Sequence, residues 1–396
     1  MRSELGALAL LWLFGICLRI TVLAIPPVIP QLHGSFALSA AAVGALASLP
    51  VILFSLVAIP GSLLVARFGA AHVLAAGILA CGAASALRGA AGSIEQLFAA
   101  TFAMGVGIAI MQPALPAVVR DWLPRRAALG TAVYSNALLV GEAISASLTI
   151  PVVLPLVGGS WRWSLVVWAV PVLLIGLLAG WAARTERPIA TTGRRLWWPD
   201  WRNPLTWKLG LLSGFASSLY FATNAFLPDY LASRGRAELL GPALSALNWV
   251  QIPASIVLLL FAERLTRRRW LFVALTATAL ASLGGLLLMD DAWIVAWSGM
   301  LGFCNAFLLI LTLALPPLIA RPEDVSRLAA AIIAIGYLCA FLVPIAGGAL
   351  WDATLAASAA FYPLIAFGIA VLAIAATLDF TPTPVPGTYQ APGNRR

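Results

Sequence analysis

Apolar runs of about 20 residues alternate with short polar, often basic segments along most of the chain. A transmembrane helix needs about 20 mostly apolar residues, so each run predicts a membrane span. Six spans are expected at 5–27, 38–65, 72–87, 94–119, 127–156 and 163–183, and six more at 209–227, 239–261, 270–289, 292–319, 328–350 and 357–378. The first run is too long for a cleaved signal peptide, and another span follows it directly.

A polar, basic segment at 184–208 divides the chain into two halves. We therefore expect an N-terminal six-helix bundle at 1–183, a central cytoplasmic loop at 184–208 and a C-terminal six-helix bundle at 209–379. The tail at 380–396 is rich in Pro, Gly and Thr, as is typical of disorder. The predicted fold class is an all-α membrane protein with twelve transmembrane helices in two pseudo-repeats.

Short motifs recur at corresponding places in the two halves. Ile59-Pro-Gly-Ser in the second span matches Ile252-Pro-Ala-Ser in the eighth, and Ala114-Leu-Pro in the fourth matches Ala314-Leu-Pro in the tenth. Two six-span repeats around a site near the membrane midplane are typical of alternating-access transporters. The repeat pattern thus favours a secondary transporter.

Composition supports a membrane protein and narrows its chemistry. Hydrophobic residues make up 62% of the chain, charged residues only 10%, and the mean hydropathy is +0.97. The four cysteines stand singly in apolar runs, and neither a phosphate-binding loop nor a zinc motif is present. We expect no enzyme activity, no metal and no cofactor.

Basic residues indicate the orientation of the chain. Most of the 24 Lys and Arg residues fall in alternate loops that share a side with both termini and the central loop. The positive-inside rule makes that side cytoplasmic, in an inner (plasma) membrane. This placement explains the net charge of +9 without nucleic acid as a partner. In this scheme Arg88 closes the third span at the outer surface, and Asp229 and Glu238 are solvated near the outer ends of spans seven and eight.

One arginine, Arg19, stands near the middle of the first span. A guanidinium in hydrocarbon costs at least roughly 3 kcal/mol, so a partner or a function must offset that cost. Two interpretations remain open: a structural ion pair or carbonyl contact, and a cavity-lining arginine that binds an anion.

Glu142 is the acidic residue deep inside a span, the fifth. Counted from the cytoplasmic ends of two helices that run in the same direction, Glu142 and Arg19 lie at similar depth and could pair. A permanent salt bridge would only lock the two spans together. A pair broken by an anion or by protonation of the acid would couple protons to transport.

Several segments resemble the major facilitator superfamily, specifically its cyanate permease and 2-nitroimidazole transporter branch. The superfamily loop motif remains as Ala66-Arg-Phe-Gly69, and its second-half counterpart as Ala262-Glu-Arg-Leu-Thr-Arg-Arg-Arg269. Features similar to the branch are Leu18-Arg19 followed by Pro26-Pro27, Gly159-Ser-Trp-Arg-Trp163, Phe226-Leu-Pro228 and Arg321-Pro-Glu-Asp324. Cys17 and Ile20 replace the Asn and Pro of the branch pattern, so the substrate is not carried over.

The resemblance implies a carrier for a small solute, with a cavity lined by spans one, four, seven and ten. Polar residues in those spans are the expected substrate-binding set: Arg19, Gln112, Tyr220, Asn224 and Asn305. Each of these polar residues also has a structural interpretation. Gln112 could cap a broken helical turn, Asn224 and Asn305 could form hydrogen bonds between helices, and Tyr220 could serve in packing. Candidates of lower rank are Asn248, Gln251, Asn136 and Tyr134. Expected gating residues are Arg67, Glu263 and Arg264.

The leading interpretation is a monomeric secondary transporter in the lipid bilayer that moves a small anion such as cyanate, or a weak organic acid in its anionic form, with Glu142 as the proton-coupling residue. The alternative is an exporter of small neutral heteroaromatic compounds or drugs, in which Arg19 is structural and the many tryptophans and phenylalanines bind the solute. A membrane enzyme or a sensor is disfavoured, because no nucleophile and base constellation and no soluble domain are evident.

Overall fold

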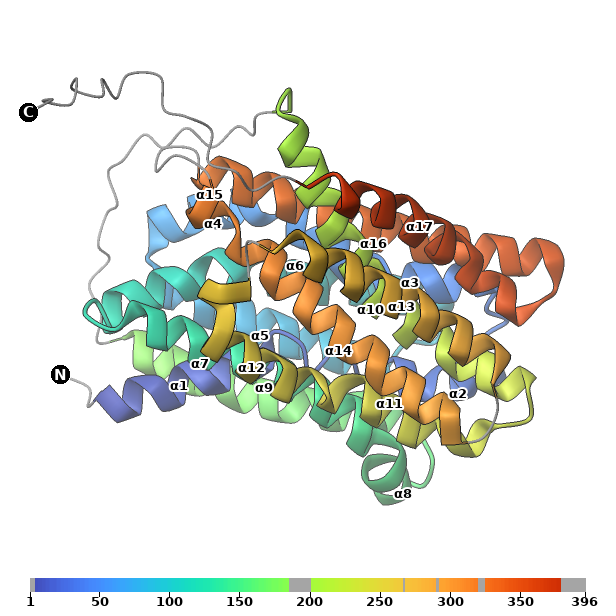
Figure 1. Ribbon diagram of the computed structural model, residues 1–396. Coiled ribbons are helices and arrows are strands. Elements are labelled where there is room, and N and C mark those ends of the chain that lie inside the picture. The colour runs from blue at the N-terminus through green and yellow to red at the C-terminus, as the bar shows by residue number, and fades with distance from the viewer. Residues whose placement is uncertain (1–3, 185–200, 266–267, 290–291, 320–324, 379–396) are drawn as a thin grey trace, which may run out of the picture.

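The structure, a computed structural model, describes residues 4–184, 201–265, 268–289, 292–319 and 325–378. These residues form helices and no strand (Figure 1). In the first half the helices are α1 (Glu4–Cys17), α2 (Ile29–Ser35), α3 (Ala40–Leu56), α4 (Ala58–Phe68), α5 (Ala70–Gly89), α6 (Ile94–Trp122), α7 (Ala127–Leu148), α8 (Leu154–Leu156) and α9 (Trp161–Ala183). In the second half they are α10 (Pro204–Ser233), α11 (Leu240–Trp249), α12 (Gln251–Leu265), α13 (Arg269–Leu288), α14 (Ala292–Ala314), α15 (Pro316–Ile319), α16 (Val325–Thr354) and α17 (Tyr362–Ala376).

Within this described part of the chain, 8 helices are long and apolar enough to cross a membrane. Two shorter apolar helices, α1 and α3, accompany them. The remaining expected spans are interrupted or, in the case of α10, carry more polar residues. The long apolar helices agree with the predicted all-α membrane fold, and the full set of twelve spans stays a prediction.

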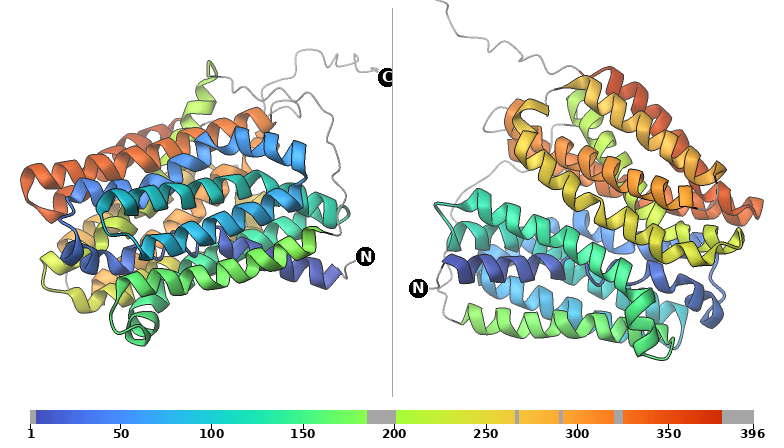
Figure 2. Two further views of the ribbon diagram at one scale, coloured as in Figure 1. Left: turned by 180° about the vertical axis from the view of Figure 1, so that it is seen from behind. Right: turned by 60° about the horizontal axis from the view of Figure 1, so that its bottom comes forward.

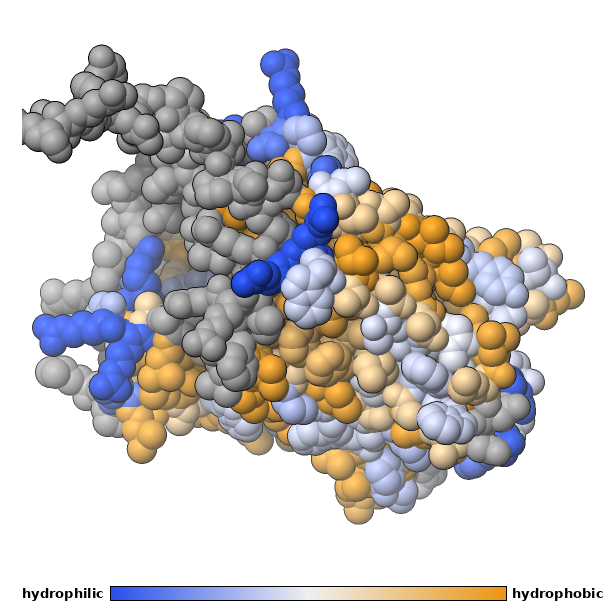
Figure 3. All heavy atoms as spheres, viewed as in Figure 1, coloured by the Kyte–Doolittle hydropathy of each residue, from blue (hydrophilic) through white to orange (hydrophobic). Residues whose placement is uncertain are grey.

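The helices of the two halves of the chain gather in two groups, which the right-hand view of Figure 2 separates. Large apolar side chains point outward from both groups, for example Leu177 at 62% exposure, Trp181 at 67% and Leu288 at 83%. Apolar residues cover the visible surface over α13 and α17 (Figure 3). A soluble monomer rarely exposes so much apolar surface, so this outer surface suits contact with lipid.

The second and eighth expected spans are both broken, at matching positions. α3 gives way to α4 at Val57, and α11 gives way to α12 at Val250. Each break lies just ahead of a repeated Ile-Pro motif, whose proline, Pro60 or Pro253, then sits in the first turn of the new helix. Proline is tolerated there because the first N–H groups of a helix have no intrahelical partner.

The first expected span is not a continuous helix, which corrects the prediction for 5–27. α1 ends at Cys17, and the chain continues as irregular turns through Ile25 before a short 3₁₀ turn at Pro26–Val28. The unwound stretch at 18–25 is buried at every position. Non-helical backbone at membrane depth is tolerated only where protein or a water-filled cavity surrounds it. The break places Arg19 on irregular backbone inside the bundle.

Two charged residues do not lie where the loop pattern placed them. Arg88 is fully buried at 0% exposure, because its side chain folds inward from the last turn of α5 instead of reaching the surface. Asp229 is not freely solvated, since its Oδ2 atom lies 2.8 Å from Nε2 of His33 on α2. Glu238, by contrast, is exposed, as expected.

Candidate functional site

Two glycines let α1 and α7 approach each other closely. Gly15 on α1 lies against the backbone carbonyl of Tyr134 on α7. Gly141 on α7 lies against the last turn of α1, where a Cβ atom would come within 2.7 Å of the carbonyl oxygen of Ile16. Because no larger side chain fits at either point, the backbone that carries Arg19 is held directly beside the turn that carries Glu142.

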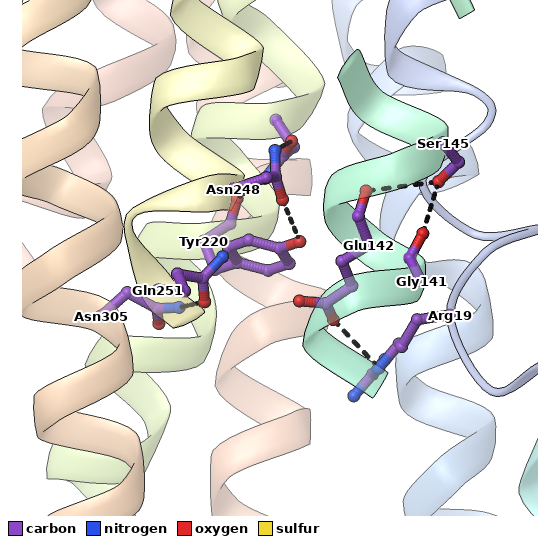
Figure 4. A network of polar contacts seen from close by, with 9 residues as sticks. Arg19, Gly141, Glu142, Ser145, Tyr220, Asn248, Gln251 and Asn305 are labelled. Carbon is purple, nitrogen blue, oxygen red and sulfur yellow. Dashed lines mark hydrogen bonds and ion pairs between the residues drawn. The ribbon is translucent and has the colours of Figure 1, made fainter. Parts of the chain in front are cut away.

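Arg19 and Glu142 form an ion pair in the interior of the protein. The Nε atom of Arg19 lies 3.2 Å from Oε1 of Glu142 (Figure 4). The two residues are only 7% and 4% exposed. Charges in such an environment are screened far less than at a surface, so the pair interacts strongly. The depth count along the sequence had indicated that these residues could meet.

The guanidinium of Arg19 retains bonding capacity. Its Nη1 atom is buried and has no hydrogen-bond partner. Its Cζ atom lies 4.8 Å from the ring centroid of Phe54 and 5.6 Å from that of Phe221. These distances are within the range of cation–π attraction. Arg19 therefore has an acid on one side, aromatic faces from both halves around it, and a free donor.

A chain of amide and hydroxyl groups from the second half of the protein faces this ion pair (Figure 4). The hydroxyl of Tyr220 donates to Oδ1 of Asn248 at 2.6 Å, and Nδ2 of Asn248 donates to Oδ1 of Asn224 at 3.3 Å. Farther along, Nδ2 of Asn305 donates to Oε1 of Gln251 at 2.8 Å. These residues come from α10, α11, α12 and α14, so the break between α11 and α12 contributes a residue on each side.

Tyr220 connects the two groups of side chains. It is close enough to Glu142 and to Arg19 to interact with their charges, although it belongs to the other half of the chain. Oδ1 of Asn305 is buried without a partner, like Nη1 of Arg19. The site thus offers one unsatisfied cationic donor flanked by two aromatic rings, one unsatisfied neutral acceptor and an acid. Such a set can bind a small polar or anionic solute.

Most of the predicted binding residues come together here: Arg19, Tyr220, Asn224 and Asn305. The residues ranked lower, Asn248 and Gln251, are integral to the network, which the sequence could not reveal because it forms only between helices. Gln112 is half-buried on α6.

The predicted gating residues are only partly described. Arg67 is exposed in the last turn of α4. The side chains of Glu263 and Arg264, like the residues Glu323 and Asp324, lie outside the described parts of the structure.

The residue types that bind metal ions are dispersed among the described residues. No group of three or more His, Cys, Asp or Glu residues that could hold a metal ion occurs there. The four cysteines are free, with Cys17, Cys81 and Cys304 buried and Cys339 half-buried. They serve as small apolar side chains between helices.

Comparison with known proteins identifies relatives that match nearly the whole chain. The 2-nitroimidazole transporter of Escherichia coli (strain K12) is 27% identical over 358 residues, which cover 89% of this chain and 90% of the relative. The cyanate transport protein CynX of the same organism is 26% identical over 392 residues, covering 96% and 98%. These matches confirm the resemblance to the branch that holds both transporters.

Solved structures and a family model agree with these relatives. A bacterial homolog of the human lysosomal transporter Spinster, in an inward-facing and occupied conformation, matches with a TM-score of 0.72 at 17% identity over 93% of each chain. This likeness shows the shared fold. The model of the Major Facilitator Superfamily matches residues 11–247. The chain therefore belongs to the major facilitator superfamily and is a membrane transporter for small solutes, not an enzyme.

Proposed function

We propose that this transporter carries a small monovalent anion through the site at Arg19, and that a proton on Glu142 accompanies the anion. The observation that carries the proposal is the buried Arg19–Glu142 pair with an unpartnered Nη1 atom. Hydrogen bonds between a guanidinium and an anion are among the strongest that side chains form. An anion can therefore compete with the Glu142 carboxylate for Arg19.

The coupling step follows from the charges. When Glu142 takes up a proton, its attraction for Arg19 weakens, and the guanidinium is free to hold the anion. When the anion leaves, Glu142 releases its proton and pairs with Arg19 again. One proton and one monovalent anion move together, so the cycle carries no net charge. Tyr220, Asn224, Asn248 and Asn305 supply neutral hydrogen-bonding groups that orient the solute.

Contacts between the halves support alternating access. Helices α3 and α16 are in contact at both ends of α3. Near its start, the N–H of Ala40 donates to Asp352, and near its end Phe54 packs edge-on against Tyr337. With His33 and Asp229, these contacts close the end of the bundle that holds α2, which we call the α2 end. If both termini are cytoplasmic, as the basic loops indicate, the α2 end is the outer one, and this conformation faces inward.

We propose the remaining organisation on the same grounds: twelve spans in two six-helix repeats, at 1–183 and 209–379, in a monomer of the inner membrane. The matching breaks at Val57 and Val250, each just before a repeated Ile-Pro motif, support the repeat. Arg67, Glu263 and Arg264 are the proposed cytoplasmic gate.

A neutral heteroaromatic substrate is the second candidate, because the rings of Phe54 and Phe221 flank Arg19. A planar solute could stack between such rings, and one relative is named a 2-nitroimidazole transporter. In that case Arg19 and Glu142 would remain paired throughout the cycle and only shape the cavity.

Thermal unfolding of the detergent-purified protein distinguishes these candidates. We would add cyanate, nitrate, thiocyanate or 2-nitroimidazole, at an acid pH that keeps 2-nitroimidazole neutral, to the wild type and to the double variant Arg19→Gln/Glu142→Gln. The double variant removes both charges together, so neither is left buried alone. A ligand at about 100 times its Kd stabilises the folded state by about 2.7 kcal/mol.

Anions that raise the midpoint of the wild type and not of the double variant support the anion site. Stabilisation by 2-nitroimidazole alone, equal in both proteins, refutes it and favours the heteroaromatic substrate.

A further inference from the structure

A second arginine, Arg88, is buried more deeply than Arg19 and stands outside the network described above. It is the largest fully buried side chain of the described chain, at 0% exposure in the last turn of α5. Its Nη2 atom donates to the carbonyl oxygen of Thr21 at 2.7 Å and to Oγ of Ser85 at 2.8 Å. Its Nε and Nη1 atoms have no hydrogen-bond partner.

Arg88 contacts the unwound stretch that presents Arg19. Thr21 lies in that stretch, and its hydroxyl approaches Sγ of Cys81 at 3.5 Å. Carbonyls of unwound backbone need partners, and at membrane depth water does not supply them freely. The Arg88 guanidinium donates a hydrogen bond to the Thr21 carbonyl and so holds the irregular segment on the side of α5. Arg19, on the same segment, points toward the other half of the protein.

The charge of Arg88 is not balanced by an acid. Among the residues that the structure describes, the buried charged side chains are Arg19, Arg88 and Glu142. Glu142 pairs with Arg19, and the hydrogen bonds of Arg88 go to a carbonyl and a hydroxyl, both neutral. Arginine keeps its proton even in the interior of a protein. The buried region around the unwound stretch therefore holds one positive charge in excess.

A neutral hydrogen-bond donor would have sufficed to bond the carbonyl oxygen of Thr21. A serine, a threonine or a glutamine can donate to a carbonyl oxygen without the desolvation cost of a buried ion, which amounts to several kcal/mol. The guanidinium adds a charge that acts over a distance through a medium that screens it weakly. When Glu142 takes up a proton, the excess rises to two positive charges. An anion that then enters the site lowers the excess to one, whereas a neutral solute leaves it at two.

We propose that Arg88 is a specificity-determining residue, whose unbalanced buried charge makes the Arg19 site prefer monovalent anions to neutral solutes of similar size. Arg88 does not touch the solute. It acts through the field of its charge and by holding the segment that carries Arg19. This inference rests on the proposed function, since it concerns which solute the same site accepts.

The test compares two substitutions of Arg88 in proteoliposomes. Arg88→Gln removes the charge and keeps a donor for Thr21, and Arg88→Lys keeps the charge. The probes are cyanate and 2-nitroimidazole, each assayed for the concentration that gives half-maximal transport or stabilisation. The assay is run at an acid pH, chosen so that Glu142 carries its proton and 2-nitroimidazole is neutral. A unit charge at roughly 10 Å in an effective dielectric of about 20 changes anion affinity about tenfold. We expect Arg88→Gln to weaken cyanate binding about tenfold, with 2-nitroimidazole unchanged and with cyanate binding retained in Arg88→Lys.

A second variant neutralises the charge without removing the guanidinium. Ser85→Asp places a carboxylate beside Nη2 of Arg88, where the serine hydroxyl now accepts a hydrogen bond. We expect the same selective loss of cyanate binding, and this variant decides the question if Arg88→Gln fails to fold. Arg162→Gln is the matched control. Arg162 is half-buried, stacks on Trp161 and bonds the Ala91 carbonyl, so its charge is exposed to screening.

Three results would overturn the proposal: unchanged cyanate binding in Arg88→Gln or Ser85→Asp, an equal loss for both probes, or the same selective loss in Arg162→Gln. Failure of the proposed function has a different signature. The double variant Arg19→Gln/Glu142→Gln would then keep its anion response, or the wild type would respond to no anion. Either of these results removes the anion site itself, and the role of Arg88 in selecting for it is overturned as well.

Discussion

Gly141 lies directly against the backbone of Ile16, so that a Cβ atom at this glycine would approach the Ile16 carbonyl oxygen to 2.7 Å. The turn that carries Glu142 and the end of α1 are therefore in contact without an intervening side chain. We expect Gly141→Val to separate them, to lower the free energy of unfolding by about 1–3 kcal/mol, as overpacking does, and to abolish transport. Thermal unfolding and uptake in proteoliposomes measure the two effects.

Gly180 provides the control for this prediction. It lies on α9, and a Cβ atom there would meet nothing within 4 Å. Gly180→Val should leave both stability and transport close to wild type. Equal effects of the two substitutions would show that any β-branched residue in these helices is harmful, and that the contact with Ile16 has no special role.

Sequence reasoning located Arg19 and Glu142 because depth along two parallel spans is a matter of counting residues. It also favoured an all-helical membrane fold, since a run of about 20 apolar residues has few other uses. It missed the unwound stretch at 18–25, because apolar residues satisfy the same hydropathy pattern in a helix and in buried irregular backbone.

The same reasoning placed Arg88 at the surface because it follows an apolar run, where charged residues usually end a span. The direction of its side chain, back along α5 toward Thr21, depends on packing between helices. The link between Tyr220 and Asn248 was hidden for a similar reason, since 28 residues separate them and only the fold brings them together. Tertiary contacts of this kind leave no local pattern.

Neutralising Glu142 should uncouple transport from protons. We expect Glu142→Gln to exchange labelled for unlabelled anion across the membrane at near wild-type rates, because Arg19 still binds the solute. Uptake driven by a pH gradient should be lost, and the rate should no longer depend on pH. Ser145→Ala, one turn away on α7, is the control and should keep the pH dependence. An unchanged pH profile in Glu142→Gln would show that another group carries the proton.

His33 and Asp229 should make the closed α2 end sensitive to pH. The hydrogen bond that Nε2 of His33 donates to the Asp229 carboxylate raises the pKa of His33 above its ordinary value of 6.5, against the opposing effect of burial. Because the pKa is raised in this conformation, the stabilisation is complete below pH 6.5 and is lost as the pH rises through the raised pKa. His33 is 35% exposed, so we expect at most about 1 kcal/mol.

This pH effect is measurable as the difference in unfolding midpoint between wild type and His33→Gln from pH 5.5 to 8.5. The wild type should gain on the variant at acid pH and converge with it at alkaline pH. His72→Gln serves as the control, since His72 is the other histidine of the chain and is exposed at the start of α5. A constant difference across the whole range would mean that His33 contributes through packing and not through charge.

Asp352 should hold the two halves together at the same end. Its carboxylate accepts hydrogen bonds from the N–H groups of Ala40 at 2.8 Å and Ala41 at 2.9 Å, in the first turn of α3. The side chain thus caps a helix of the other half, and the loss of such a cap costs about 1 kcal/mol. We expect Asp352→Ala to favour opening at the α2 end by about fivefold in equilibrium.

A buried position between the same helices reports this opening. Ser48 is 0% exposed on α3, where its hydroxyl bonds the Gly44 carbonyl and approaches the Phe341 carbonyl of α16 at 3.4 Å. A cysteine at this position, Ser48→Cys, should react with a membrane-impermeant thiol reagent only when α3 and α16 separate, and faster when Asp352→Ala is also present. The protein that keeps Ser48 measures the background labelling of the four native cysteines. Equal labelling with and without Asp352→Ala would show that the cap does not control this end of the transporter. Faster labelling by a reagent added on the outer side of the membrane would also establish that the α2 end is the outer one.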